Sequence, residues 1–250
     1  AVPVTGRVRV SGSQTPGTYF PAGADPSLTL ETWVKFNEVN AVADQCILDK
    51  MNGSGGYQLK LLAGTDQLAI RFGNATTASG STGIVAGRWY HVAATWNGAA
   101  NTAKIYLNGV EVASQQHAGA GVLTDSGSYL TFGNAAFPDA PFNGCLDEVR
   151  LSSTAYTFAK QPEFPPLYDP ADPDTLAIYR MESSELGTGA GDLVVGPADG
   201  EHISFEIAEG FSGTALKNTG ISGTDMSRIT VKDSASGAAG IFPSGSDPSL

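Results

Sequence analysis

A regular alternation of apolar and polar residues, broken by short turn sequences, is the feature of this chain that most restricts its fold. Residues 103–113 show it best, because two alternating runs flank the dipeptide Asn108-Gly109. Asn-Gly between such runs is typical of a β-hairpin, since a type I′ turn needs positive φ at both central residues. Residues 30–36 alternate in the same way and are predicted to form a half-buried strand. Candidate strands of this kind continue over residues 28–151 without any helical period, which predicts a β-sandwich.

The composition is that of a folded, acidic chain. Of 250 residues, 41% are hydrophobic and only 16% are charged, which suffices for a sizeable core and excludes global disorder. The formal net charge is −11 and no cluster of Lys and Arg occurs, so we expect neither nucleic acid nor an anionic membrane as a partner. No run approaches about 18 apolar residues, so no membrane insertion is expected. Residues 1–15 also lack the charged and apolar segments of a signal peptide.

Cysteine and histidine are too sparse for the usual metal and thiol sites. Cys46 and Cys145 show no CxxC spacing, and the three histidines lie far apart in the sequence, so a structural zinc site is not expected. Two alternatives remain for the cysteines. They are either buried as small apolar groups or joined by a disulfide, which the oxidising surroundings of a secreted chain would permit.

A proline-rich segment divides the chain. Residues 161–174 contain five prolines, so this stretch can form neither a helix nor a central strand. We therefore predict a β-sandwich over residues 1–160, a linker over residues 161–174 and a further β-rich segment over residues 175–250.

Part of the beginning of the chain is repeated near its end. Residues 18–28 and residues 240–250 are identical at seven of eleven positions, 222 residues apart. Upstream of these, residues 8–10 resemble residues 229–231, at a separation of 221 residues. Similarity at one fixed period is typical of tandem modules. The sequence therefore predicts a tandem repeat with a period of about 222 residues, whose neighbouring copies in the same chain would be partners.

Four segments, in order, resemble the strand motifs of one known family. They are Ser27–Lys35 for the motif SLxLExWVK, Gly87–Trp96 for GxWHHVAxTxx, Ile105–Val110 for LYxDGxxV and Phe142–Leu151 for FxGxIDEVRIY. Over residues 19–153 the chain thus resembles the laminin-G-like, concanavalin A-like jelly-roll domains of the lectin, glucanase and pentraxin superfamily. The resemblance implies an all-β fold, an antiparallel two-sheet jelly-roll sandwich.

The opening strands of that family come at the end of this sequence. Residues 176–182 resemble the family's first strand, and residues 213–216 resemble the strand that follows it. Either a second repeat begins near Asp174, or strands from beyond the linker complete the first sandwich. We expect Thr175–Glu182 to pair beside the closing strand, Asn143–Leu151, because an uncovered strand would leave unpaired backbone groups at the sheet edge.

The resemblance does not bring the catalytic residues of the family's β-glucanases. Those enzymes carry a Glu-x-Asp-x-x-Glu pattern, which is absent here. Asp147 and Glu148 are adjacent, and neighbouring strand residues point to opposite faces, so they cannot form the pair of carboxyl groups that retaining hydrolysis needs. We therefore expect a non-catalytic module.

The charged residues of the closing strand are expected to have structural roles. Strict alternation places Glu148 and Arg150 on one face with Leu146, and Asp147 on the other face with Val149. The expected cross-strand partners of the first pair are Lys35 and Glu31. Asp147 should be bound by backbone amides of a loop, because an unpaired buried carboxylate is costly.

The three tryptophans allow two interpretations. Trp33, Trp89 and Trp96 could stack on sugar rings, or they could pack within and upon the sheets. The motif positions, two of them in the middle of a strand, favour packing.

Ligand sites of the family lie in loops at the rim of the sandwich and are often assisted by calcium. The candidate calcium ligands are Asp44, Asp49, Asp125 and Asp139, and Asn52 is a further candidate rim residue. The resemblance implies a secreted or cell-surface recognition module that binds a glycan or an extracellular protein through these loops. The alternative is a spacer repeat of a larger adhesin or surface protein, without a ligand of its own.

Overall fold

The computed structural model describes residues 6–10, 23–118, 123–135, 140–158, 172–181, 193–197, 205–209 and 214–218, with single positions at 13, 15, 17 and 19–21. Regular structure in these residues consists entirely of β-strands. None of them forms a helix that is long and apolar enough to cross a membrane. Most of the predicted linker, the predicted strand end Glu182 and the second copy of the repeat lie outside the described residues.

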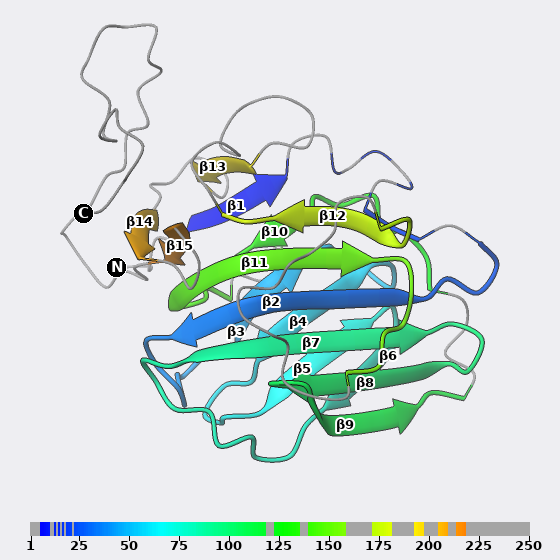
Figure 1. Cartoon of the computed structure of the whole chain (residues 1–250), viewed down its shortest axis with the longest axis horizontal. Coiled ribbons are helices and arrows are strands. Elements are labelled where there is room, and N and C mark those ends of the chain that lie inside the picture. Colours follow the sequence, from blue (N-terminus) through cyan, green and yellow to red (C-terminus); the bar gives the residue numbers. More distant parts are fainter. Residues whose placement is uncertain are drawn as a thin grey trace, which may run out of the picture.

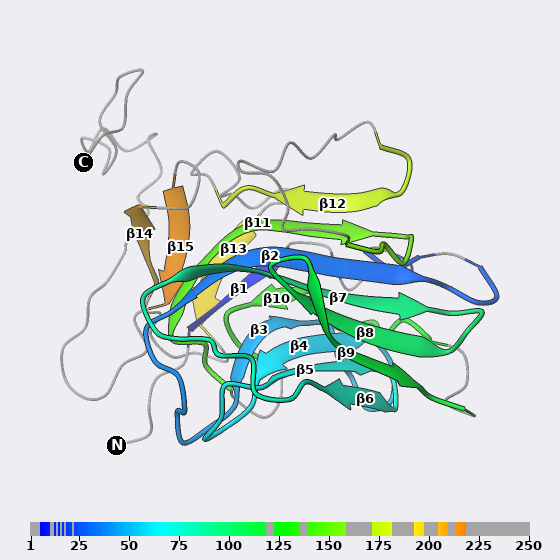
Figure 2. The ribbon, with the colours of Figure 1, turned by 60° about the horizontal axis from the view of Figure 1, so that its bottom comes forward.

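The strands form two antiparallel sheets stacked face to face (Figures 1 and 2). Across sheet A the order is β13 (Leu193–Pro197), β1 (Gly6–Val10), β10 (Thr131–Phe132), β3 (Gln45–Asp49), β4 (Tyr57–Leu61), β5 (Leu68–Phe72) and β6 (Ala75–Ala78). Across sheet B the order is β14 (Phe205–Glu209), β15 (Thr214–Asn218), β11 (Gly144–Ser152), β2 (Leu28–Phe36), β7 (Trp89–Asn97), β8 (Thr102–Leu107) and β9 (Val110–Gln116), with β12 (Thr175–Tyr179) also paired to β11. The predicted all-β sandwich is confirmed.

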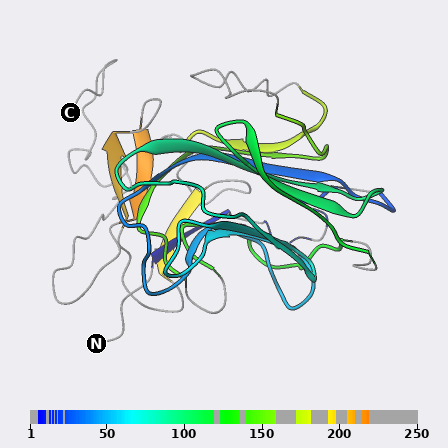
Figure 3. The same cartoon turned by 90° about the horizontal axis from the view of Figure 1, so that it is seen from below.

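Figure 3 shows the two sheets as stacked layers, and the hydrophobic core lies between them. Leu30, Val34 and Phe36 of β2 are fully buried in it, as their alternation predicts. The opposite face of β2 is covered as well, since Trp33 is only 1% exposed and Glu31 only 3%. The predicted half-buried strand is therefore a central strand with both faces buried.

The hairpin predicted at Asn108-Gly109 is present. β8 pairs antiparallel with β9, and φ is 50° at Asn108 and 76° at Gly109. Both central residues thus adopt the left-handed conformation that a type I′ turn requires.

Strands from beyond the proline-rich segment complete the edge of sheet B. β12 pairs antiparallel with β11 from Val149 to Ser152, which confirms the pairing predicted for this segment. β15 pairs with the other end of β11, from Gly144 to Leu146. One edge of β11 is therefore covered by two successive strands, and Figure 1 shows β12 lying along it.

A β-bulge in β11 overturns the predicted alternation of the closing strand. The register of β11 against β2 shifts between Asp147 and Arg150, and Glu148 adopts a φ of 48°. Leu146 and Val149 consequently both lie in the core, because the bulge inserts one extra residue. The carboxylate of Asp147 is fully buried and accepts a hydrogen bond from the amide of Glu148 at 2.8 Å. The predicted hydrogen bond from a backbone amide to Asp147 is present, but the donating amide belongs to the bulge and not to a loop.

The bulge also decides the ion pairs of this strand. Arg150 lies opposite Glu31, with 3.6 Å between Nη1 and Oε1, as predicted. The prediction that Glu148 pairs with Lys35 is wrong. Its Oε2 lies 3.4 Å from Nη1 of Arg180, the residue directly after the last residue of β12, Tyr179.

Candidate functional site

Three loops meet at the end of the sandwich where β3 and β5 terminate and β10 begins. We call residues 50–56, 73–74 and 123–130 the Lys50 rim. Backbone hydrogen bonds join the loops, since the amide of Gly73 donates to the carbonyl of Gly56 and the amide of Gly56 donates to the carbonyl of Thr124, both at 2.8 Å. The three loops therefore form one connected surface.

Glycine is required at the closest contact between these loops, Gly56, and a second contact, at Gly55, is also tight. Gly56 has a φ of 89°, and a Cβ atom at this position would lie 1.8 Å from the carbonyl oxygen of Lys50. At Gly55 a Cβ would lie 3.2 Å from the carbonyl oxygen of Asp125. The run of glycines after β3 thus allows one loop to press against the next.

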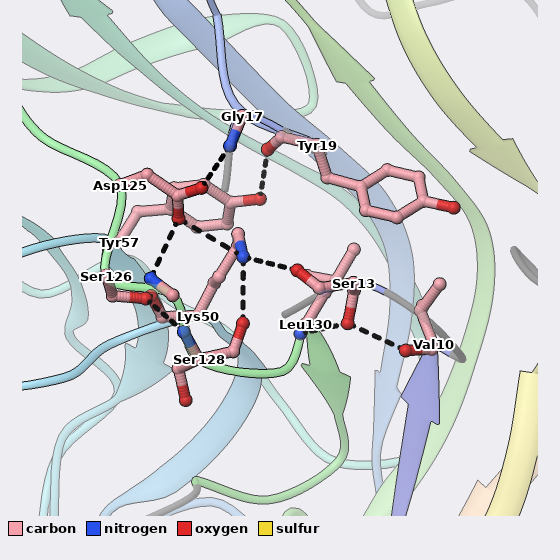
Figure 4. Close-up of polar contacts among 11 residues, drawn as sticks. Val10, Ser13, Gly17, Tyr19, Lys50, Tyr57, Asp125, Ser126, Ser128 and Leu130 are labelled. Atoms are coloured by element: carbon pink, nitrogen blue, oxygen red, sulfur yellow. Dashed lines mark hydrogen bonds and ion pairs between the residues drawn. The ribbon is translucent and has the colours of Figure 1, made fainter. Parts of the chain in front are cut away.

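The ammonium group of Lys50 is the centre of the rim (Figure 4). Its side chain is 0% exposed, and Nζ donates to the carbonyl oxygens of Ser13 at 2.7 Å and Ser128 at 2.8 Å. The carboxylate of Asp125 lies 3.2 Å from the same nitrogen. Three oxygen partners match the three protons of the ammonium group, so a buried charge is fully compensated. Burial lowers the pKa of Lys50, and the neighbouring Asp125 opposes that shift.

The acceptors around Lys50 are themselves held in place. Asp125 also accepts hydrogen bonds from the amides of Gly17 at 2.8 Å and Gly127 at 3.2 Å. Ser126 Oγ donates to the carbonyl of Lys50 at 2.6 Å and accepts from the amide of Ser128 at 3.0 Å. The loop 123–130 is therefore fixed by its own side chains as well as by the lysine.

The beginning of the chain is fastened to the same rim. Ser13 Oγ donates to the carbonyl of Val10 at 2.7 Å and accepts from the amide of Leu130 at 2.8 Å. The hydroxyl of the fully buried Tyr57 donates to the carbonyl of Tyr19 at 2.8 Å. Figure 4 shows these contacts converging from β1, β3, β4 and the loop before β10.

Several polar side chains of the rim are exposed to solvent and form no hydrogen bond with the described part of the protein. Asn52, Ser54, Asn74 and Thr124 are exposed, and their side chains make no hydrogen bond to the described residues. All four are neutral groups that donate or accept hydrogen bonds. The rim therefore presents free neutral polar groups on loops whose backbone is fixed.

The described candidate calcium ligands do not gather into one site. Asp44 precedes β3 at the opposite end of the sandwich and accepts from Lys60 Nζ at 2.7 Å. Asp49 is buried and accepts from Gln58 Nε2 at 2.9 Å, while Asp125 faces the ammonium group of Lys50. Asp139 lies outside the described residues, among which no group of three His, Cys, Asp or Glu could hold a metal ion. Calcium binding stays a prediction. The carboxylate of Asp125 and the carbonyl oxygens beside it do not fit a calcium site, because they already surround the ammonium group of Lys50.

Of the predicted rim residues, the structure brings Asp125 and Asn52 to the Lys50 rim. Sequence reasoning missed Lys50 and Ser13, which are central to it. The available signal was a lysine placed between a buried strand and the glycine run 53–56, where loops approach closely.

The outer face of sheet B is covered by the chain itself. Arg150 Nη2 donates to Asp172 Oδ2 at 2.7 Å, and the hydroxyl of Tyr156 donates to the same oxygen at 3.0 Å. Phe158 packs against His91 and Tyr106, with 5.4 Å and 5.1 Å between the respective ring centres. These contacts hold the residues after β11 against the sheet, so its outer face is not an open binding surface there.

The tryptophans have packing roles, as predicted. Trp33 and Trp96 are 1% and 2% exposed. Trp89 is partly exposed, and Lys35 Nζ lies 5.0 Å from the centre of its ring.

Both cysteines are buried and neither forms a disulfide, so the disulfide alternative is wrong. Cys46 belongs to β3 of sheet A and Cys145 to β11 of sheet B. Neither is a member of the core cluster between the sheets, whereas their neighbours Ile47 and Leu146 are. The two thiols therefore lie on the outward faces of different sheets.

Cys46 should make the protein less stable at alkaline pH. Burial raises the pKa of its thiol well above the ordinary 9.0, so above pH 9 the unfolded chain loses a proton that the folded chain keeps. This contribution is fully present below pH 9 and falls by up to about 1.4 kcal/mol per pH unit above it. Unfolding free energies of the parent and of Cys46→Ala, compared from pH 8 to 10, should converge as the pH rises. A constant difference would contradict the prediction.

The comparisons with known proteins agree with this architecture. Residues 10–160 match the family model described as the concanavalin A-like lectin/glucanases superfamily. A search of curated proteins gives no match. The crystal structure of a candidate carbohydrate-binding protein from Bacteroides ovatus is 22% identical, with a TM-score of 0.58 over 88% of this chain and 60% of that one.

Two further solved structures are weaker likenesses. The SAP-like pentraxin of Limulus polyphemus is 17% identical, with a TM-score of 0.49 over 63% of this chain and 74% of the pentraxin. The CBM40 of the Ruminococcus gnavus IT-sialidase is 15% identical, with a TM-score of 0.47 over 62% of this chain and 90% of that module. With the family match covering more than half of the residues, the chain belongs to the concanavalin A-like lectin/glucanase superfamily.

Proposed function

We propose that this chain is a non-catalytic carbohydrate-binding module that takes its ligand at the Lys50 rim. The observation that carries the proposal is the combination of a fixed loop backbone with the exposed side chains of Asn52, Ser54, Asn74 and Thr124. Sugar hydroxyl groups pair with neutral donors and acceptors of this kind. Because the loops are already ordered, binding would cost little conformational entropy.

The likeness to the candidate carbohydrate-binding protein from Bacteroides ovatus supports this proposal through the shared fold. The present chain spans 60% of that protein. A secreted or cell-surface location, with a glycan or a glycan-bearing surface protein as the partner, follows from the same proposal.

The buried acids of β11 support a non-catalytic role. Asp147 is 0% exposed and Glu148 is 2% exposed, and each is engaged within the sheet, by the amide of the bulge and by Arg180 respectively. Retaining glycoside hydrolysis needs two accessible carboxyl groups about 5–5.5 Å apart beside the sugar. We therefore expect no turnover of β-glucans, and hydrolysis that is lost in Asp147→Asn would overturn this part of the proposal.

The rim can be tested by substitution. A glycan array should first identify a ligand for the parent protein. The double variant Asn52→Ala/Asn74→Ala should then bind that glycan at least about fivefold more weakly, because two side-chain hydrogen bonds contribute roughly 0.5–1.5 kcal/mol each. Both side chains are exposed, so the melting temperature should stay unchanged.

The matched control lies at the other end of the sandwich. Glu38 follows β2, is exposed and makes no side-chain hydrogen bond or ion pair with the described residues, so Glu38→Ala should bind like the parent. Unchanged binding by the rim variant, or an equal loss in the control, would contradict binding at the Lys50 rim.

A spacer module is the second candidate function. The similarity of residues 18–28 to residues 240–250 favours it, because repeated modules also serve as stalks. A glycan array without hits, obtained with folded protein, would favour the spacer over the binding module.

A further inference from the structure

Several of the residues repeated near the end of the sequence face inward in the first copy. Val10 and Ser13 are 0% exposed, Phe20 is 7% exposed and Leu28 is 0% exposed. Their counterparts, at separations of 221 or 222 residues, are Val231, Ser234, Phe242 and Leu250. Packing against a sandwich explains why these four positions are kept.

Two of the positions that differ, Arg9 and Ala24, are less constrained in the first copy. Arg9 is only partly buried and its counterpart is Thr230, while the exposed Ala24 corresponds to Ser246. Gly23, by contrast, has a φ of 117°, a conformation that suits glycine alone, and its counterpart is again glycine. At these positions the similarity follows the burial and the backbone conformation of the first copy.

The first copy already occupies its own partners. β1 lies between β10 and β13 and pairs with both. The carbonyl of Ser13 takes one proton of Lys50, and Ser27 Oγ accepts a hydrogen bond from the amide of Gly98 at 3.1 Å. A second segment with the same inward residues therefore needs a second strand like β10, a second buried lysine and a second close turn.

We infer that residues 227–250 are the opening segment of a second sandwich built on the same plan, and that the partner they dock to is a second copy of this module. The boundary between modules then lies after β15, between residues 218 and 227. β12 to β15 belong to the first sandwich, because β12 and β15 pair with β11, β13 pairs with β1, and β14 pairs with β15. The inference does not depend on glycan binding at the Lys50 rim.

A segment exchange within the full chain tests this inference. Residues 6–28 are replaced by a second copy of residues 227–250, and in a control by the same residues in scrambled order. The exchange variant should melt cooperatively within about 10 °C of the parent, because the inward residues are kept. The scrambled control should lose the cooperative transition or melt far lower. An exchange variant no better than the scrambled control would overturn the inference.

Hydrogen exchange gives an independent readout. In the 250-residue chain the amides of residues 229–231 should exchange freely. When a copy of residues 29–226 is appended after Leu250, the same amides should become protected at least about a hundredfold, as expected for a paired strand. Protection already in the 250-residue chain, or none in the extended chain, would show that the segment does not open a second sandwich.

Discussion

Lys50→Met is expected to lower the free energy of unfolding by about 3–5 kcal/mol. The substitution keeps most of the side-chain volume but removes the ammonium group, which leaves the carboxylate of Asp125 and the carbonyls of Ser13 and Ser128 without their shared partner. Removing one member of a buried charged cluster costs this much because the remaining charge stays desolvated. Urea denaturation of parent and variant measures the difference directly.

Lys60→Met is the matched control for this experiment. Lys60 also pairs with an aspartate, since its Nζ lies 2.7 Å from Asp44 Oδ2, but the two side chains are 24% and 32% exposed. A solvent-exposed pair contributes at most about 1 kcal/mol, so the control should change stability little. Equal effects of the two substitutions would contradict a special role for the buried ammonium group.

Gly56→Ala is expected to lower the free energy of unfolding by more than about 4 kcal/mol. The new Cβ would lie 1.8 Å from the carbonyl oxygen of Lys50, and it can be accommodated only if the backbone of the rim moves. The φ of 89° adds the cost of a left-handed conformation for a residue with a side chain. If the variant stays folded, urea denaturation gives its free energy of unfolding. If it does not fold, the loss of the β-sheet signal in far-ultraviolet circular dichroism already shows the effect.

Gly64→Ala separates the two causes. Gly64 lies in the turn between β4 and β5 with a φ of 66°, and a Cβ there would meet nothing within 4 Å. Only the cost of the left-handed backbone conformation remains, so we expect the free energy of unfolding to fall by about 1–2 kcal/mol. A Gly56→Ala loss no larger than this control would contradict the close approach of the loops at the rim.

These two pairs of variants also bear on the proposed function. If the Lys50 rim binds glycans because its loops are held in advance, Lys50→Met should weaken binding even under conditions where the protein remains folded. Lys60→Met, at the other end of β3 and β4, should leave binding unchanged.

Local signals in the sequence were sufficient for most of the sandwich. The Asn108-Gly109 turn, the alternation of residues 30–36 and the four family motifs depend on residues close together in the chain. Such signals act within one strand or hairpin, where side-chain direction follows from backbone geometry. They also predicted the pairing of β12 with β11, because a sheet edge needs a partner.

The rim and the bulge were decided only by the tertiary structure. Lys50 meets Ser13, Asp125 and Ser128 from distant parts of the chain, and in the sequence it resembles an ordinary lysine at the end of a strand. Likewise the bulge at Glu148 depends on β2, which pairs with β11 on one side, while β12 and β15 share its other side. A buried charge and an extra strand residue are tolerated only when remote groups compensate them, and the position of those groups is fixed by the packing of the whole sandwich.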